Sequence, residues 1–77
     1  MKDYIDIYNK DGKIEKMEAV SIFNLDGYDY NYIIYKTLDN KHYYIAKYKG
    51  EDIVNLDTNL TTEELSLANK VFESIIT

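Results

Sequence analysis

The side chains that could carry nucleophilic, acid–base or metal chemistry are few in this sequence. His42 is the only histidine, and there is no cysteine among the 77 residues. Disulfides, thiolate sites and a histidine-based zinc site within one chain are therefore excluded. His42 lies near Asp39 and several tyrosines, but no oriented partner stands at a spacing that would make it a general base. We interpret His42 as a surface or packing residue.

The serines and glycines show no catalytic or phosphate-binding pattern. Ser21, Ser66 and Ser74 have no nucleophile-elbow motif around them. The three glycines are isolated from one another, so they form no glycine-rich phosphate loop. The sequence predicts that the protein is not an enzyme and has no catalytic residues, no cofactor and no metal.

One segment follows part of the pattern of a calcium-binding loop. With Gly12 at the sixth place, Asn9, Asp11 and Glu18 fall at the third, fifth and twelfth places. The first place is then Ile7, which cannot bind a cation, and the flanking residues alternate as strands do. We favour a hairpin turn over a calcium site.

Residues 36–50 are locally basic within an acidic chain. The formal net charge of the chain is −5, whereas this segment sums to +3 and leaves −8 for the rest. Its lysines alternate with tyrosines, which could stack on unpaired bases of a small RNA. Alternatively, lysines on an exposed hairpin prevent edge-to-edge pairing, while tyrosines pack their rings inward and keep their hydroxyls in water. We favour the second interpretation.

Tyrosine is unusually abundant, with nine tyrosines and no tryptophan. So small a core cannot hide that many rings, and tyrosine is enriched at protein interfaces. We therefore expect a protein-interaction module whose partner is another protein. The residues predicted to form the interaction surface are Tyr35, Lys41, Tyr43, Tyr44, Lys47, Tyr48 and Lys49.

The acidic remainder of the chain supports an alternative function. A compact acidic protein can occupy a groove meant for nucleic acid, with carboxylates in place of phosphates. The chain would then be an inhibitor of a nucleic-acid-processing enzyme, a role that fits a phage or a mobile element. Direct binding to nucleic acid is not expected, because the net charge is negative and arginine is absent.

The same composition guides expectations about location and self-association. No segment approaches the roughly 18 consecutive apolar residues of a membrane-spanning helix. Met1-Lys2-Asp3 leads directly into alternating residues without the apolar stretch of a signal peptide. We expect a cytoplasmic protein with no membrane partner. A homo-oligomer formed through an edge strand is a special case of the interaction hypothesis.

Three turn signals divide the first two thirds of the chain: Asp11-Gly12, Asp26-Gly27 and Asp39-Asn40. Asp-Gly provides the positive φ angles of a two-residue type I′ hairpin turn. A turn at Asp26-Gly27 would place Phe23 opposite Tyr30 and Ala19 opposite Ile34. Apolar residues then fall on both faces of this hairpin, and a bulge near Ser21 could change which set faces the core.

The C-terminal segment predicts an amphipathic helix from Thr62. Thr61 and Glu64 fit a capping box, and Leu60 and Leu65 are placed for a hydrophobic staple. An apolar arc faces away from a polar side. The arc comprises Leu65, Ala68, Val71, Phe72, Ile75 and Ile76, and the polar side comprises Ser66, Asn69, Lys70 and Glu73.

These elements predict a single α+β domain over residues 1–77. We expect an antiparallel meander sheet of four to five strands, with residues 51–56 as the short fifth, and one C-terminal helix packed on one face. The order of hairpins, Asp-Gly turns and capped helix is carried by Asp11-Gly12, Ile22 to Gly27, Tyr30, Ile33-Ile34, His42 to Ala46, and Glu64 to Ile76. With these residues the chain resembles the YrzB-like family of small acidic bacterial proteins. The family is uncharacterised, so the resemblance implies a fold and a bacterial origin and no active site. Family members are richer in Glu and Asp than this chain.

Overall fold

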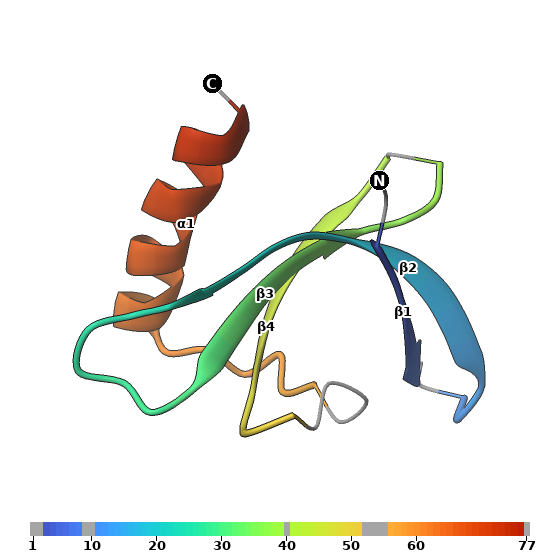
Figure 1. The fold of residues 1–77 in the computed structure, drawn as a ribbon, viewed down its shortest axis with the longest axis horizontal. Coiled ribbons are helices and arrows are strands. Elements are labelled where there is room, and N and C mark those ends of the chain that lie inside the picture. Colours follow the sequence, from blue (N-terminus) through green and yellow to red (C-terminus); the bar gives the residue numbers. More distant parts are fainter. Residues whose placement is uncertain (1–2, 9–10, 40, 52–55, 77) are drawn as a thin grey trace.

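A computed structural model of the chain shows four strands followed by one helix (Figure 1). The structure describes residues 3–8, 11–39, 41–51 and 56–76. The strands are β1 (Asp3–Tyr8), β2 (Ile14–Asn24), β3 (Asn31–Lys36) and β4 (Tyr43–Tyr48), and the helix is α1 (Thr62–Ile76).

The strands form one antiparallel sheet in the order β1-β2-β3-β4. This meander with one C-terminal helix confirms the predicted α+β architecture. Most of the predicted fifth strand, residues 52–55, lies outside the described residues. Beyond it, Asp57 forms an isolated antiparallel bridge with Lys47 of β4.

The hairpin connections are longer than the two-residue turns that the sequence predicts. Pairing between β1 and β2 ends at Tyr8 opposite Ile14, and pairing between β2 and β3 ends at Asn24 opposite Asn31. Phe23 therefore lies opposite Tyr32 and Ala19 opposite Tyr35, so the predicted pairings with Tyr30 and Ile34 are both wrong. The positive φ of the glycine in each Asp-Gly pair remains, +76° at Gly12 and +87° at Gly27.

The predicted irregularity in β2 is confirmed. Ala19 pairs with Tyr35 and Ser21 pairs with Ile34, so Val20 has no partner of its own on β3. The extra residue reverses the alternation along β2, because side chains on either side of a bulge exchange faces. Phe23 consequently shares a face with Tyr32, and their rings stack with centroids 5.8 Å apart.

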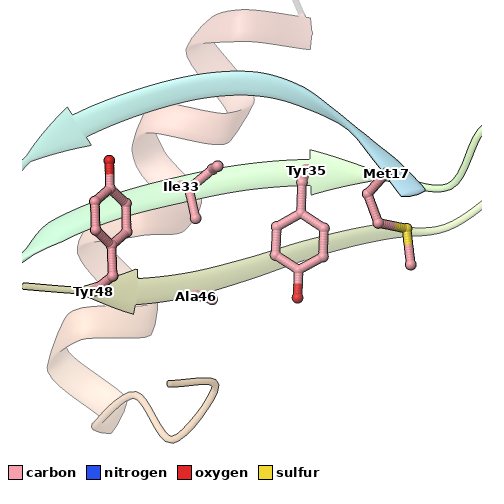
Figure 2. Close-up of a cluster of buried hydrophobic side chains, with 5 residues drawn as sticks. All are labelled: Met17, Ile33, Tyr35, Ala46 and Tyr48. Carbon is pink, nitrogen blue, oxygen red and sulfur yellow. The ribbon is translucent and has the colours of Figure 1, made fainter. Parts of the chain in front are cut away.

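The two faces of the sheet are buried by different parts of the chain. The main apolar cluster consists of Met17, Ile33, Tyr35, Ala46 and Tyr48, and we call the face that bears it the core face. Figure 2 shows these side chains in front of β3 and β4, with α1 behind the strands. The opposite face, which we call the helix face, bears Tyr32, Ile34 and Lys47 under the helix.

The core face is closed by the outer parts of the sheet. Ile5 and Ile7 of β1 and Leu56 are half-buried and pack against the apolar cluster. The two outer strands also line a common groove, because Ile7 and Tyr44 both contribute to it. The sheet is therefore curved toward its core face, with the long strand β2 carrying the bend (Figure 1).

The predicted helix and its capping box are confirmed. The amide of Glu64 donates to Oγ1 of Thr61 (3.1 Å), and the amide of Thr61 donates to Oε1 of Glu64 (2.9 Å). The polar side of the helix is exposed as predicted. The apolar arc is buried only at its centre: Ala68 is fully buried, whereas Leu65 and Ile75 at its two ends are each 41% exposed.

Candidate interaction surface

The structure divides the seven residues that the sequence predicts as an interaction surface. Tyr35, Lys47 and Tyr48 are buried, so their assignment to an exposed surface is wrong. The physical reason is that β3 and the second half of β4 are covered on both faces, by the apolar cluster on one and by α1 on the other. Tyr43 and Tyr44 are exposed but point to opposite faces, and Lys41 and Lys49 are exposed at the ends of the hairpin.

The locally basic segment does not form a continuous positive surface. Lys36 lies 3.6 Å from a carboxylate oxygen of Glu18, and Lys47 lies 3.1 Å from Oε1 of Glu64. Two of its four lysines are therefore neutralised by acidic residues of other elements. Because a nucleic-acid platform needs an uncompensated positive groove, this arrangement offers little to a phosphate backbone.

The ion pair between Lys47 and Glu64 forms the centre of a buried polar cluster. The ammonium of Lys47 donates to both carboxylate oxygens of Glu64, at 3.1 and 3.3 Å, and lies 4.5 Å from the centroid of the Tyr30 ring. The hydroxyl of Tyr32 donates to Oε2 of Glu64 at 2.5 Å. Glu64 is 1% exposed and Lys47 is 8% exposed. We call Tyr30, Tyr32, Lys47, Thr61 and Glu64 the helix clamp.

The helix clamp holds its groups in one charge state. Hydrogen bonds from the Thr61 amide, then from Tyr32 and Lys47, lower the pKa of Glu64 to about 2. The bond to Glu64 raises the pKa of Lys47, and burial followed by the bond to Glu64 raises the pKa of Tyr32. A general acid or base works best with a pKa near the ambient pH. Each of these shifts moves away from neutrality, so the cluster is suited to joining elements and unsuited to proton transfer.

The structure also places His42 and the calcium-like segment, the two other sites considered from the sequence. His42 is exposed at the start of β4, and its amide donates to the hydroxyl of Thr37 at 3.3 Å. The calcium-like segment lies between two paired strands, and its Asn9 is outside the described residues. Within the described ranges, no three His, Asp or Glu residues are close enough together to hold a metal ion.

A groove on the core face brings aromatic and apolar side chains to the surface. It has a volume of ≈ 450 Å³, and we call it the tyrosine groove. Ile7 and Tyr8 come from β1, Met17 from β2, and Tyr35 and Tyr44 from β3 and β4. Its full lining is Ile7, Tyr8, Glu15, Met17, Tyr35, Tyr44, Leu56 and Thr58.

The floor of the tyrosine groove is a stacked pair of rings. Tyr35 is buried, and Tyr44 lies over it with ring centroids 5.4 Å apart and planes inclined by 25°. Tyr44 is 42% exposed, so one side of its ring is held by Tyr35 while the rest is accessible. Figure 2 shows Tyr35 beside Met17 at this end of the apolar cluster. A ring held in this way loses little freedom when a partner contacts it.

The neighbouring Tyr43 has the same degree of exposure but a different role. It faces the helix, where its ring centroid lies 5.2 Å from that of Phe72 and 5.9 Å from the ammonium of Lys36. Sequence reasoning grouped Tyr43 with Tyr44, although the period-2 alternation of a strand already separates them. It also missed Ile7, Met17 and Leu56, because these reach the groove only through the curvature of the sheet.

Comparisons with known proteins give no family for this chain. No family model matches it, and neither the curated proteins nor the solved structures contain a match. The resemblance to the YrzB-like family therefore stays a prediction. In the part of the chain that the structure describes, no helix is long and apolar enough to cross a membrane.

Proposed function

We propose that this chain is a non-enzymatic module that binds another protein through the tyrosine groove. The observation that supports the proposal is the half-exposed ring of Tyr44, stacked on Tyr35 at the floor of a groove with apolar walls. Aromatic side chains seated in pockets provide much of the binding energy at protein interfaces. The partner would insert an apolar side chain beside Tyr44 and exclude water from Met17 and Leu56.

At least three of the fourteen acidic residues are engaged within the chain, which reduces the number of carboxylates available for nucleic-acid mimicry. A mimic needs rows of carboxylates that are available to a basic partner. Here Glu64 is buried and Glu18 is paired with Lys36. Asp39 accepts hydrogen bonds from the hydroxyl of Thr37 and the amide of Lys41. Each of these three carboxylates is used within the chain.

Site-specific crosslinking tests the proposal with a matched control. A photoreactive phenylalanine analogue is placed at position 44 in the groove or at position 43 on the helix face, since the two tyrosines are 42% and 44% exposed. In cells that express the protein, we expect a discrete crosslinked protein from position 44 and none from position 43. Excess unlabelled protein should compete, whereas excess of the Tyr44→Ala variant should not.

Circular dichroism of each variant verifies that the fold is retained. Equally strong crosslinks from positions 43 and 44 would contradict binding at the groove. So would a competition experiment in which excess Tyr44→Ala variant abolishes the crosslink as well as the unaltered protein does.

A further inference from the structure

The outer edge of β1 is the feature from which a more specific mode of binding follows. β1 is the first strand in the sheet order, and β2 is its only paired strand among the described residues. The strand sequence from Asp3 to Tyr8 contains no lysine or proline, two residues that commonly prevent an edge from pairing. In Figure 1, β1 and α1 lie at opposite ends of the molecule, so the helix does not cover this edge.

The opposite edge of the sheet, formed by β4, is partly occupied by another segment of the chain. On β4, the amide of Lys47 donates to the carbonyl of Asp57 and the amide of Asp57 donates to the carbonyl of Lys47, both at 2.9 Å. The segment that leads to α1 thus occupies part of the edge of β4. Strand addition is therefore favoured at β1 over β4.

The side chains of β1 select the charge of an added strand. Asp3 and Asp6 are exposed, and the strand carries no positive charge. On the helix side of β1, Asp6 stands between Tyr4 and Tyr8, which are 53% and 54% exposed. From β2, Lys16 lies opposite Asp6 and its ammonium is 6.0 Å from the centroid of the Tyr4 ring.

An added strand could place a cation on the free side of β1, as β2 places Lys16 on its paired side. A lysine or arginine placed opposite Asp6 on the free side would form an ion pair with the carboxylate and contact the faces of the tyrosine rings. The residues before and after that cation would point to the core face, beside Ile5 and Ile7. Grooves begin at both of these isoleucines: the tyrosine groove at Ile7, and a second groove of ≈ 390 Å³ at Ile5 that extends to the exposed Ile22.

From this arrangement we propose that β1 binds an extended segment of the partner protein as an added strand, with a lysine or arginine facing Asp6 between two apolar residues. The proposal deepens the proposed function and rests on it, because the segment is the part of the partner that leads into the tyrosine groove. Backbone hydrogen bonds to β1 would give affinity, and the alternating side chains would give specificity.

A second copy of this chain is a poorer occupant of the same edge. Two copies of β1 side by side would bring together the carboxylates of Asp3 and Asp6 from both strands, with no positive charge from either. Each copy would also carry a formal net charge of −5. The carboxylates therefore act against self-pairing while they favour a basic segment.

The test uses the full chain and a fluorescent form of the peptide acetyl-Ser-Thr-Val-Lys-Val-Thr-Ser-amide. We expect fluorescence anisotropy to show binding that weakens as salt is added, and NMR to show the largest amide shifts in β1. A matched peptide with glutamate in place of lysine should bind at least about tenfold more weakly, because like charges then face each other. The Asp6→Lys variant should reverse this preference, whereas Asp26→Lys, the same charge change in a distant loop, should preserve it.

Several outcomes would overturn the strand-addition proposal. They are an absence of binding to the lysine peptide, equal binding of the two peptides, amide shifts confined to β4 or α1, and sedimentation that shows a dimer at the concentrations used. If position 44 still crosslinks to a partner in cells while Asp6→Lys has no effect, the proposed function stands and only the mode of binding fails. If position 44 gives no specific crosslink and Asp6→Lys also has no effect, both the proposed function and the mode of binding fail.

Discussion

The ammonium of Lys47 in β4 lies 3.1 Å from Oε1 of Glu64 in the first turn of α1, and both side chains are buried. This pair fixes more than the position of the helix. Successive residues of a strand alternate between faces, so a shift of β4 by one residue would turn Lys47 away from α1 and leave Glu64 without its cation. We infer that the pair specifies the register of β4.

The same register places the candidate interaction surface. Tyr44 is three residues before Lys47 on β4, and an odd spacing puts the two side chains on opposite faces. The pairing that brings Lys47 under the helix therefore presents Tyr44 to the tyrosine groove, where it stacks on Tyr35. Changes in the helix clamp would be transmitted to the groove only through loss of this register.

A double-mutant cycle tests the helix clamp. Glu64→Gln retains a side chain that can cap the helix and accept from Tyr32, but it leaves the buried ammonium of Lys47 without a counter-charge. We expect a loss of about 3 kcal/mol in the free energy of unfolding, measured with urea at neutral pH. Adding Lys47→Met removes the unpaired buried charge and should recover about half of that loss in stability or more.

The control for this cycle is Glu63→Gln, the same substitution at the exposed neighbouring position, which should change stability by less than about 0.5 kcal/mol. Losses in the double variant that equal the sum of the two single losses would show that the two side chains do not interact, contrary to their separation of 3.1 Å.

The pH dependence of stability should report the carboxylate of Glu64. Its pKa falls from an ordinary 4.5 to about 2 in the folded chain, so it binds a proton less readily when folded than when unfolded. The stability that this shift provides is present above the unfolded pKa and is lost as the pH falls through the folded pKa. We expect the stability difference between the unaltered protein and Glu64→Gln to shrink between about pH 5 and pH 2.

Urea titrations at a series of pH values measure this difference. Asp39→Asn is the comparison, because hydrogen bonds from Thr37 and from the amide of Lys41 lower the pKa of Asp39 at an exposed position. Solvent screening makes the contribution of Asp39 to stability smaller. Asp39→Asn should therefore reduce the acid limb, which is the fall in the free energy of unfolding at low pH, less than Glu64→Gln does. A parallel acid limb in the Glu64→Gln variant would refute the assignment.

Features that depend on a few neighbouring residues could be predicted from the sequence. The helix begins where the Thr61 to Glu64 capping box places it, because both capping bonds join residues three apart. The bulge in β2 follows from apolar residues on both faces of one strand, a conflict that an inserted residue resolves. The hairpin registers could not be predicted, since the loops are longer than the Asp-Gly pairs and the bulge shifts the partner residues.

The candidate site depends on contacts between distant parts of the chain. The locally basic hairpin predicts Lys47 at the surface, yet its partner Glu64 lies 17 residues further along the chain and draws it under the helix. A signal was present: Tyr43, Ile45 and Lys47 alternate on the face that an amphipathic helix would cover. The tyrosine groove has no such local signal, because it forms only when the curved sheet brings β1 toward β4.

Deleting Val20 tests whether the bulge produces that curvature. The deletion joins Ala19 to Ser21, whose partners Tyr35 and Ile34 are already adjacent on β3, so a regular ladder can form. A regular ladder bends and twists less, and the β1 half of the sheet would move off the core face. We expect a loss of at least about 2 kcal/mol in urea unfolding, together with an exposed Tyr35. Val20→Ala retains the extra residue and should cost about half as much or less.

Quenching of tyrosine fluorescence by acrylamide would detect the opened core face in the deletion variant. A deletion variant as stable as the unaltered protein, with unchanged quenching, would show that the curvature comes from another part of the sheet.

Asn31 connects two loops at the end of the sheet opposite the tyrosine groove. Its Oδ1 accepts from Nδ2 of Asn24 at 2.8 Å, and its own Nδ2 donates to the carbonyl of Gly50 at 2.9 Å. Asn31→Ala removes both bonds and should cost about 1–2 kcal/mol in the free energy of unfolding. Asn69→Ala is the control, because it replaces an exposed helical asparagine with a better helix former and should be neutral or stabilising.

Asn31→Ala should destabilise the end of β4 before the rest of the chain. Because the bond to Gly50 secures the end of β4, amide hydrogen exchange should accelerate first at Lys49 and Gly50, while the amides of α1 keep their protection. Crosslinking from position 44 should be retained, since Tyr44 lies at the other end of β4 and keeps its contact with Tyr35. Uniform acceleration throughout the chain would instead indicate that Asn31 acts on global stability alone.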